Sequence, residues 1–186
     1  MSLLVNRPNH RGAILVAVIL AGAAAVVFAA GTGKPKADSS SSGLVKGEWI
    51  DCNTISEVKQ DGDNQLITVM ITEKFSGALN GNYEGIERNV VHKDGSGSFN
   101  GSGSFNGQVN GRSGTAVMTY SGTVDAKGVG HAHWVLDQGT DGLVRIDGHG
   151  TFEGKETKQA PPDCTDPKTQ SAWSGSYTGT VEFGGH

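Results

Sequence analysis

The sequence predicts an all-β protein: a small antiparallel barrel of about eight strands, preceded by one N-terminal apolar helix. The main indication is a direct repeat, GSGSFN, at residues 95–100 and 101–106. Because six is an even number, Phe99 and Phe105 lie on the same face if this segment is extended. Counting onward in twos places Val109 and Val117 on that face too. The 29 glycines of this 186-residue chain are poorly compatible with helix.

Alternating apolar residues and turn signals predict the other strands. The expected strands are residues 45–50, 54–60, 65–75, 82–93, the repeat, 114–125, 129–138, 143–154 and 173–183. Asn-Gly pairs, which favour tight hairpin turns, begin at Asn80, Asn100, Asn106 and Asn110. Turning at both Asn100 and Asn106 leaves only about four residues between the turns, which is too short for a useful strand. We therefore expect at most two of these pairs to be turns.

Composition and charge exclude some classes of function. The formal charge is -4, and the Lys and Arg residues are not clustered as a phosphate-binding surface requires. We therefore expect no nucleic-acid partner. We also find no phosphate loop or nucleophile motif, and we expect no cofactor.

The N-terminal part predicts export. Residues 1–11 form a short basic N-terminus, and residues 12–33 form a signal peptide or a membrane anchor. Residues 34–43 form a Ser-rich linker and residues 44–186 the β-barrel domain. The expected location is extracytoplasmic, either secreted or membrane-anchored, with the membrane as a partner if the N-terminal segment is not cleaved. A disulfide between Cys52 and Cys164 suits such a location.

Three glycine-rich segments carry a resemblance: GRSGTAVMTYSG at 111–122, GTDGLVRIDGHGTFEG at 139–154 and SGSYTGTVEF at 174–183. They resemble a bacterial family of uncharacterised domains with an allene-oxide-cyclase-like barrel. The similarity covers residues 47–183 and implies the barrel fold. The plant cyclases that give the fold its name isomerise an unstable fatty-acid epoxide. This chain has no motif that matches the catalytic residues of those cyclases, so any catalytic residues of this chain are unknown.

Aromatic residues are the first candidates for a site. They could line a cavity for a small apolar or sugar-like ligand, or they could fill the core of a glycine-rich barrel, which the sequence favours. The candidate ligand-binding residues are Trp49, Tyr83, Trp134, Trp173 and Tyr177.

Histidines and carboxylates offer further candidates. His131 and His133 alternate in a strand, about 7 Å apart on one face, and could bind a metal with His149 or Asp147. Alternatively, they are polar residues of the outer face. Glu84 and Glu87 fall on opposite faces of an ideal strand and do not form a catalytic carboxylate pair unless a bulge reorients one of them.

The sequence favours a ligand-binding or interaction module over an enzyme. The alternatives are an isomerase or cyclase that acts on a lipid-like molecule inside the barrel, and a structural envelope protein. A cavity that contains a buried ionisable residue would favour the enzyme.

Overall fold

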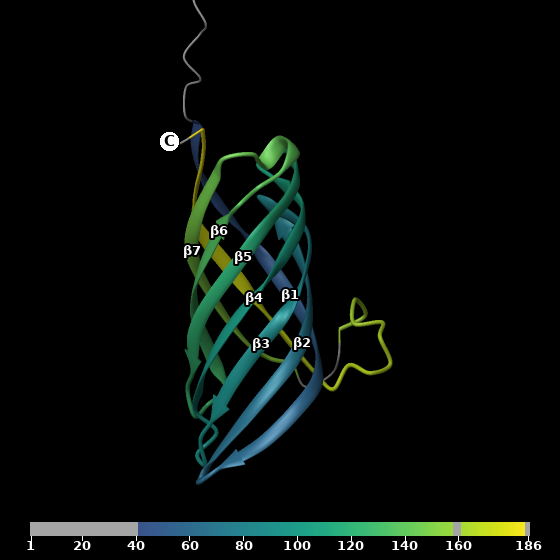
Figure 1. Ribbon diagram of the computed structural model, residues 1–186, viewed down its shortest axis with the longest axis vertical. Coiled ribbons are helices and arrows are strands. Elements are labelled where there is room, and N and C mark those ends of the chain that lie inside the picture. Colours follow the sequence, from purple (N-terminus) through teal and green to yellow (C-terminus); the bar gives the residue numbers. More distant parts are fainter. Residues whose placement is uncertain (1–40, 158–160, 185–186) are drawn as a thin grey trace, which may run out of the picture. The chain divides into compact units, whose positions relative to one another are not determined.

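The computed structural model describes residues 41–157 and 161–184. Their eight strands form a closed antiparallel barrel in which sequence neighbours pair and β8 returns to β1 (Figure 1). The strands are β1 (Ser41–Asp61), β2 (Asn64–Gly77), β3 (Leu79–Val91), β4 (Gly97–Val109), β5 (Arg112–Val124), β6 (Val129–Asp137), β7 (Ile146–Glu156) and β8 (Ser171–Phe183). The prediction of an all-β barrel of about eight strands is confirmed.

The predicted N-terminal segment, residues 12–33, lies outside the described residues. Among those that are described, no helix is long and apolar enough to cross a membrane. The one helical element there is η1 (Asp141–Leu143), a single 3₁₀ turn between β6 and β7.

The first strand differs from its prediction. Residues 45–50 and 54–60, expected to be two strands, belong to the single strand β1, which begins at Ser41. The register of its pairing with β2 shifts between Ile55 and Glu57. Residues 51–53, between the two predicted halves, stay paired with β2, so the strand continues and the register shift after them is a bulge within β1.

The GSGSFN repeat lies in β4 and the turn before it. Phe105 and Val109 are buried inside the barrel, as predicted. Val117 is only half-buried, because the chain reverses at Asn110-Gly111 and the count in twos restarts in β5. Both turn residues have positive φ, 49° and 81°, the conformation that Asn-Gly favours in a two-residue hairpin. The other three Asn-Gly pairs lie within strands, as expected.

The segment before β7 also differs from its prediction. The strand expected at 143–154 begins at Ile146, because Asp141 and Arg145 adopt positive φ and the chain forms η1. Leu143 is fully buried there. We call this end of the barrel, with η1 and the β2–β3 and β4–β5 turns, the closed end. Fully buried Val45, Leu79, Val109 and Val181 lie in the strand segments near it.

The middle of the barrel is filled by aromatic rings that lie against glycines. A Cβ on Gly101 would overlap the ring of Tyr120 on the neighbouring strand. In the same way, a Cβ on Gly150 or Gly179 would collide with the Trp134 ring. The inward glycines are therefore sites of close approach that let large rings pack inside a narrow barrel.

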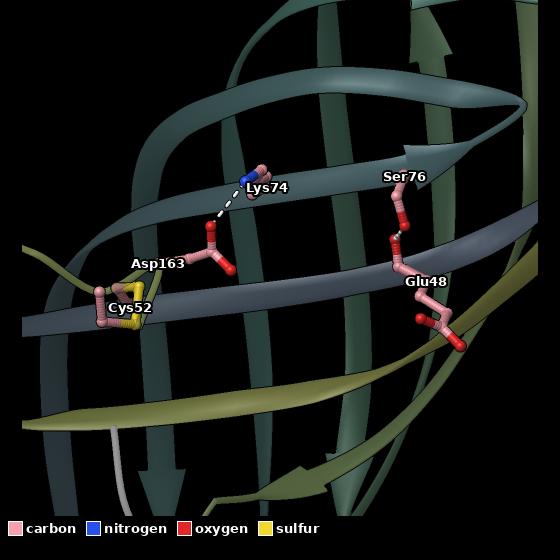
Figure 2. A network of polar contacts seen from close by, with 6 residues as sticks. Glu48, Cys52, Lys74, Ser76 and Asp163 are labelled. Atoms are coloured by element: carbon pink, nitrogen blue, oxygen red, sulfur yellow. Dashed lines mark hydrogen bonds and ion pairs between the residues drawn. A yellow bond between two sulfur atoms is a disulfide. The ribbon is translucent and has the colours of Figure 1, made fainter. Parts of the chain in front are cut away.

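The connection between β7 and β8 is held against the outer wall of the barrel. Cys52 of β1 and Cys164 of the connection form a disulfide, as predicted. Figure 2 shows the neighbouring contact, in which the Lys74 ammonium donates to the Asp163 carboxylate at 2.6 Å. The Gln170 side chain accepts a hydrogen bond from the Ile55 backbone amide at 2.6 Å. These contacts fix both ends of the described segment 161–170 to β1 and β2.

Replacement of Gly101 by Ala should lower the free energy of unfolding by about 1–3 kcal/mol, because the new methyl group displaces the Tyr120 ring. Gly130→Ala is the matched control, because its Cβ would have no neighbour closer than 3.5 Å. We expect that control to change stability by less than about 1 kcal/mol. Urea denaturation of both variants measures the difference. Equal stabilities would contradict the packing described.

Candidate functional site

A pocket of about 270 Å³ lies inside the barrel at the end opposite η1. We call this the open end; it carries the β1–β2, β3–β4 and β5–β6 hairpins. The wall of the pocket is mostly apolar and aromatic. The carboxyl and amide side chains that line it come from β1, β2, β3 and β7, and are Asp51, Asn53, Glu73, Glu87, Asn89 and Glu156. The site is thus an acidic pocket with an apolar wall.

Asp51 and Glu73 form the centre of this site. They are direct cross-strand partners in the β1–β2 ladder, and both face the barrel interior. Their exposed fractions are 7% and 6%. Two like-charged groups in directly opposed positions repel each other when both are ionised, and burial strengthens the repulsion. The arrangement therefore favours a protonated state for at least one of them.

Burial raises the pKa of Asp51 to about 8, and the nearby carboxyl of Glu87 adds to the rise. Two hydrogen bonds oppose it. The Trp173 backbone amide donates to Asp51 Oδ1 at 3.0 Å, and the Asn53 side-chain amide donates to the same oxygen at 2.9 Å. Asp51 is therefore oriented by two donors, yet it still holds its proton at neutral pH.

Burial also raises the pKa of Glu73 well above its usual value, and Asp51 and Glu87 add to the rise. The Glu73 Oε2 atom has no hydrogen-bond partner among the described residues, and neither does Asn53 Oδ1. A buried polar atom without a partner costs about 1–3 kcal/mol. Both atoms belong to residues that line the pocket, so a bound molecule could satisfy them.

Glu87 is the third carboxyl of the pocket. Burial raises its pKa, while the Asn89 side-chain amide, which donates to it at 2.9 Å, and Tyr120 partly offset the rise. Burial likewise raises the pKa of the Tyr83 and Tyr120 hydroxyls, with a further contribution from Glu73. The two tyrosine hydroxyls therefore remain neutral near neutral pH.

Aromatic side chains form much of the apolar wall. The Trp49 indole donates to the Ser176 carbonyl at 3.2 Å and contacts Phe152 with ring centroids 5.9 Å apart. Tyr120 lies between Phe152 and Phe99, at centroid distances of 6.1 and 6.2 Å. These mutual contacts fix the rings, so the apolar wall is preformed.

The structure divides the predicted ligand-binding residues. Trp49 and Trp173 line the pocket. Tyr83, Trp134 and Tyr177 do not; they are buried in the hydrophobic core. The Tyr177 hydroxyl accepts from the Leu79 backbone amide at 2.6 Å and lies within reach of two carbonyls, a structural role near the closed end.

The predicted metal residues lie elsewhere. His131 and His133 are on the exposed face of β6, where His131 Nδ1 is 3.7 Å from a Glu153 carboxylate oxygen. His149 is exposed too, beside Thr180. Within residues 41–157 and 161–184, no three His, Cys, Asp or Glu side chains are grouped closely enough to hold a metal ion.

Sequence reasoning missed Asp51 and Glu73, although a signal was present. Glu73 continues the inward face of β2, after Val69 and Ile71 and before Phe75. Asp51 follows Trp49 by two residues and takes the same inward direction in β1. A carboxylate in register with a buried apolar face is unusual and marks a candidate site. Glu84 and Glu87 fall on opposite faces of the strand, as their spacing predicts: Glu87 faces inward and Glu84 is exposed.

The fold and this pocket define a closed eight-stranded barrel with an acidic interior cavity at one end. Residues 50–163 match the family described as "Protein of unknown function (DUF3224)", and the chain belongs to this family. No curated protein matches it.

A crystal structure of a protein with unknown function from the same family, from Shewanella oneidensis MR-1, is similar. The two chains are 16% identical with a TM-score of 0.59, and the alignment covers 78% of this chain and all of the other. At that identity the likeness concerns the fold alone.

The buried carboxyls predict how stability depends on pH. Because Asp51 has a pKa of about 8 when folded and an ordinary pKa near 3.8 when unfolded, the folded state holds more protons between these values. The free energy of unfolding should therefore fall as pH rises through that window, by up to about 1.4 kcal/mol per pH unit for each such carboxyl. Above the folded-state pKa it should level off. Glu73 and Glu87 act in the same direction.

Asp51→Asn should flatten this dependence, because the amide oxygen still accepts the two hydrogen bonds but cannot ionise. Glu84→Gln, on the exposed face of β3, is the control and should leave the slope unchanged. Denaturant titrations at a series of pH values measure the slopes. A wild-type stability that rises with pH through this window would contradict the buried, protonated carboxyls.

Proposed function

We propose that this protein binds a small, largely apolar molecule in the pocket at the open end of the barrel. The observation that carries the proposal is the combination of a preformed aromatic wall with a buried acid, Glu73, whose Oε2 atom lacks a hydrogen-bond partner among the described residues. A pocket of about 270 Å³ suits a molecule near the lower end of the size range of small-molecule ligands.

The acids support binding over a purely structural role. Buried carboxyls without counter-ions lower the stability of a protein. Apolar residues at these positions would give a more stable barrel, so a purely structural role does not explain the acids. Side chains that lower the stability of a protein are found most often at its functional sites. The side chains of Asp51 and Glu73 meet this description.

A second candidate is acid–base catalysis in the same pocket, by an isomerase or cyclase that acts on a lipid-like molecule. The observation that favours it is a carboxyl, Asp51, whose pKa of about 8 lies close to neutral pH, where a group can both give and take a proton. The sequence resemblance to allene-oxide-cyclase-like barrels points the same way, by analogy of fold.

We propose that the protein binds its ligand outside the cytoplasm. The Cys52–Cys164 disulfide suits an oxidising compartment, and the apolar segment 12–33 suits export with cleavage or with retention as a membrane anchor. The binding domain would then act either as a secreted protein or close to a membrane surface.

Binding of the neutral fluorescent probe N-phenyl-1-naphthylamine tests the proposal. The full chain should enhance its emission at micromolar probe concentrations. Val124 lines the pocket, so the larger side chain of Val124→Trp should occupy part of it. This variant should weaken probe binding at least about tenfold, or about 1.4 kcal/mol.

Val135→Trp is the matched control, because Val135 is 42% exposed on the outside of β6. Circular dichroism establishes that both variants fold. Equal probe binding by the wild type and by both variants would place the probe elsewhere and overturn the proposal.

A further inference from the structure

We propose that the ligand of this pocket is an organic cation: a small amine with an apolar or aromatic body, whose ammonium group lies among Asp51, Glu73 and Glu87. This inference rests on the proposed ligand-binding function and names the chemical class of the ligand. It follows from three features of the pocket: an unbalanced set of acids, unpartnered acceptor atoms and an aromatic wall.

The described lining of the pocket supplies no counter-ion for the acids. The described lining residues include four carboxyl side chains and no Lys, Arg or His. Lys74, which follows Glu73 in sequence, faces outward and is held by Asp163 on the outer wall (Figure 2). A buried carboxylate group is normally paired with a positive charge, so the missing partner has to come from outside the described barrel or the acids must stay protonated.

The free acceptor atoms suit an ammonium group. Glu73 Oε2 and Asn53 Oδ1 belong to side chains that are 6% and 5% exposed, and neither atom has a hydrogen-bond partner among the described residues. An alkylammonium group offers up to three N–H donors and no acceptor. Charge-assisted hydrogen bonds to these oxygens would satisfy the atoms that the fold leaves unpaired.

The wall of the pocket suits the rest of such a molecule. Trp49, Trp173, Phe99, Tyr120 and Phe152 all line the cavity. Aromatic faces attract cations, and they also bury an apolar body. A carboxylate or phosphate ligand, in contrast, would meet four acids and no cationic side chain in the described lining. A metal ion does not fit, since the described residues contain no group of three ligands placed to hold one.

Binding of a cation should be linked to proton release. The groups that face Asp51 and Glu73 are Glu87 and Tyr83 from β3, Tyr120 from β5 and Glu156 from β7; the described lining residues of β4, β6 and β8 add no titratable side chain. The tyrosines stay neutral, so the carboxyls are the source of the proton. An ammonium group that enters this cluster favours the ionised form of at least one carboxyl and displaces its proton.

Calorimetric titration of the full chain with two isosteric probes tests this inference. The probes are 1-naphthylmethylamine, which is a cation at about pH 7.5, and 1-naphthalenemethanol, which is neutral. We expect the amine to bind at least about tenfold more tightly than the alcohol. In buffers of different ionisation enthalpy, amine binding should release close to one proton, whereas binding of the alcohol should release none.

Variants assign the effect to the acids. Glu73→Gln keeps the size of the side chain and should weaken amine binding at least about tenfold, while alcohol affinity stays within about twofold. Glu84→Gln, on the exposed face of β3, should change neither.

Two outcomes separate the possible failures. If both probes bind with equal affinity and Val124→Trp abolishes both, the pocket binds ligands but has no preference for cations, and this inference is overturned. If neither probe binds, the proposed ligand-binding function fails as well.

Discussion

The close fit between inward glycines and aromatic rings is the constraint on which the rest of this structure depends. In a closed barrel of eight strands, the interior has room for few large side chains. Tyr120 lies against Gly101, and Trp134 lies against Gly150 on the neighbouring strand β7 and Gly179 on β8, the strand after it. Each ring occupies the volume that a side chain on the neighbouring strand would otherwise need. The glycine-rich sequence is therefore a packing device.

This packing is uneven along the barrel, and the pocket is its consequence. Near the closed end, aliphatic residues and the 3₁₀ turn with buried Leu143 fill the interior. Near the open end the inward positions carry carboxyls and amides, and the apolar rings form a wall without filling the centre. The disulfide and the Lys74–Asp163 contact fix the β7–β8 connection outside the barrel, against β1 and β2.

The sequence predicted the architecture better than the site. Alternation and turn residues identified the strands, because burial of one face leaves a period of two in any half-buried strand. Two errors occurred where the backbone departs from this period, at the Asn110-Gly111 turn and at η1. A third concerned residues 51–53, which were not predicted as strand although they pair with β2. The site was harder, since it depends on which strands become neighbours around the barrel. Only pairing of β1 with β2 places Asp51 opposite Glu73.

The barrel holds an interior cluster of acids in which Asp51 and Glu73 are buried and for which the described lining of the pocket supplies no cationic side chain. The central claim is that Asp51 holds its proton at neutral pH in the free protein. Carbon-13 NMR of the Asp51 carboxyl during a pH titration tests this claim most directly. We expect a midpoint near 8. A midpoint close to the ordinary aspartate value of 3.8 would show a solvated or paired carboxylate and contradict the account.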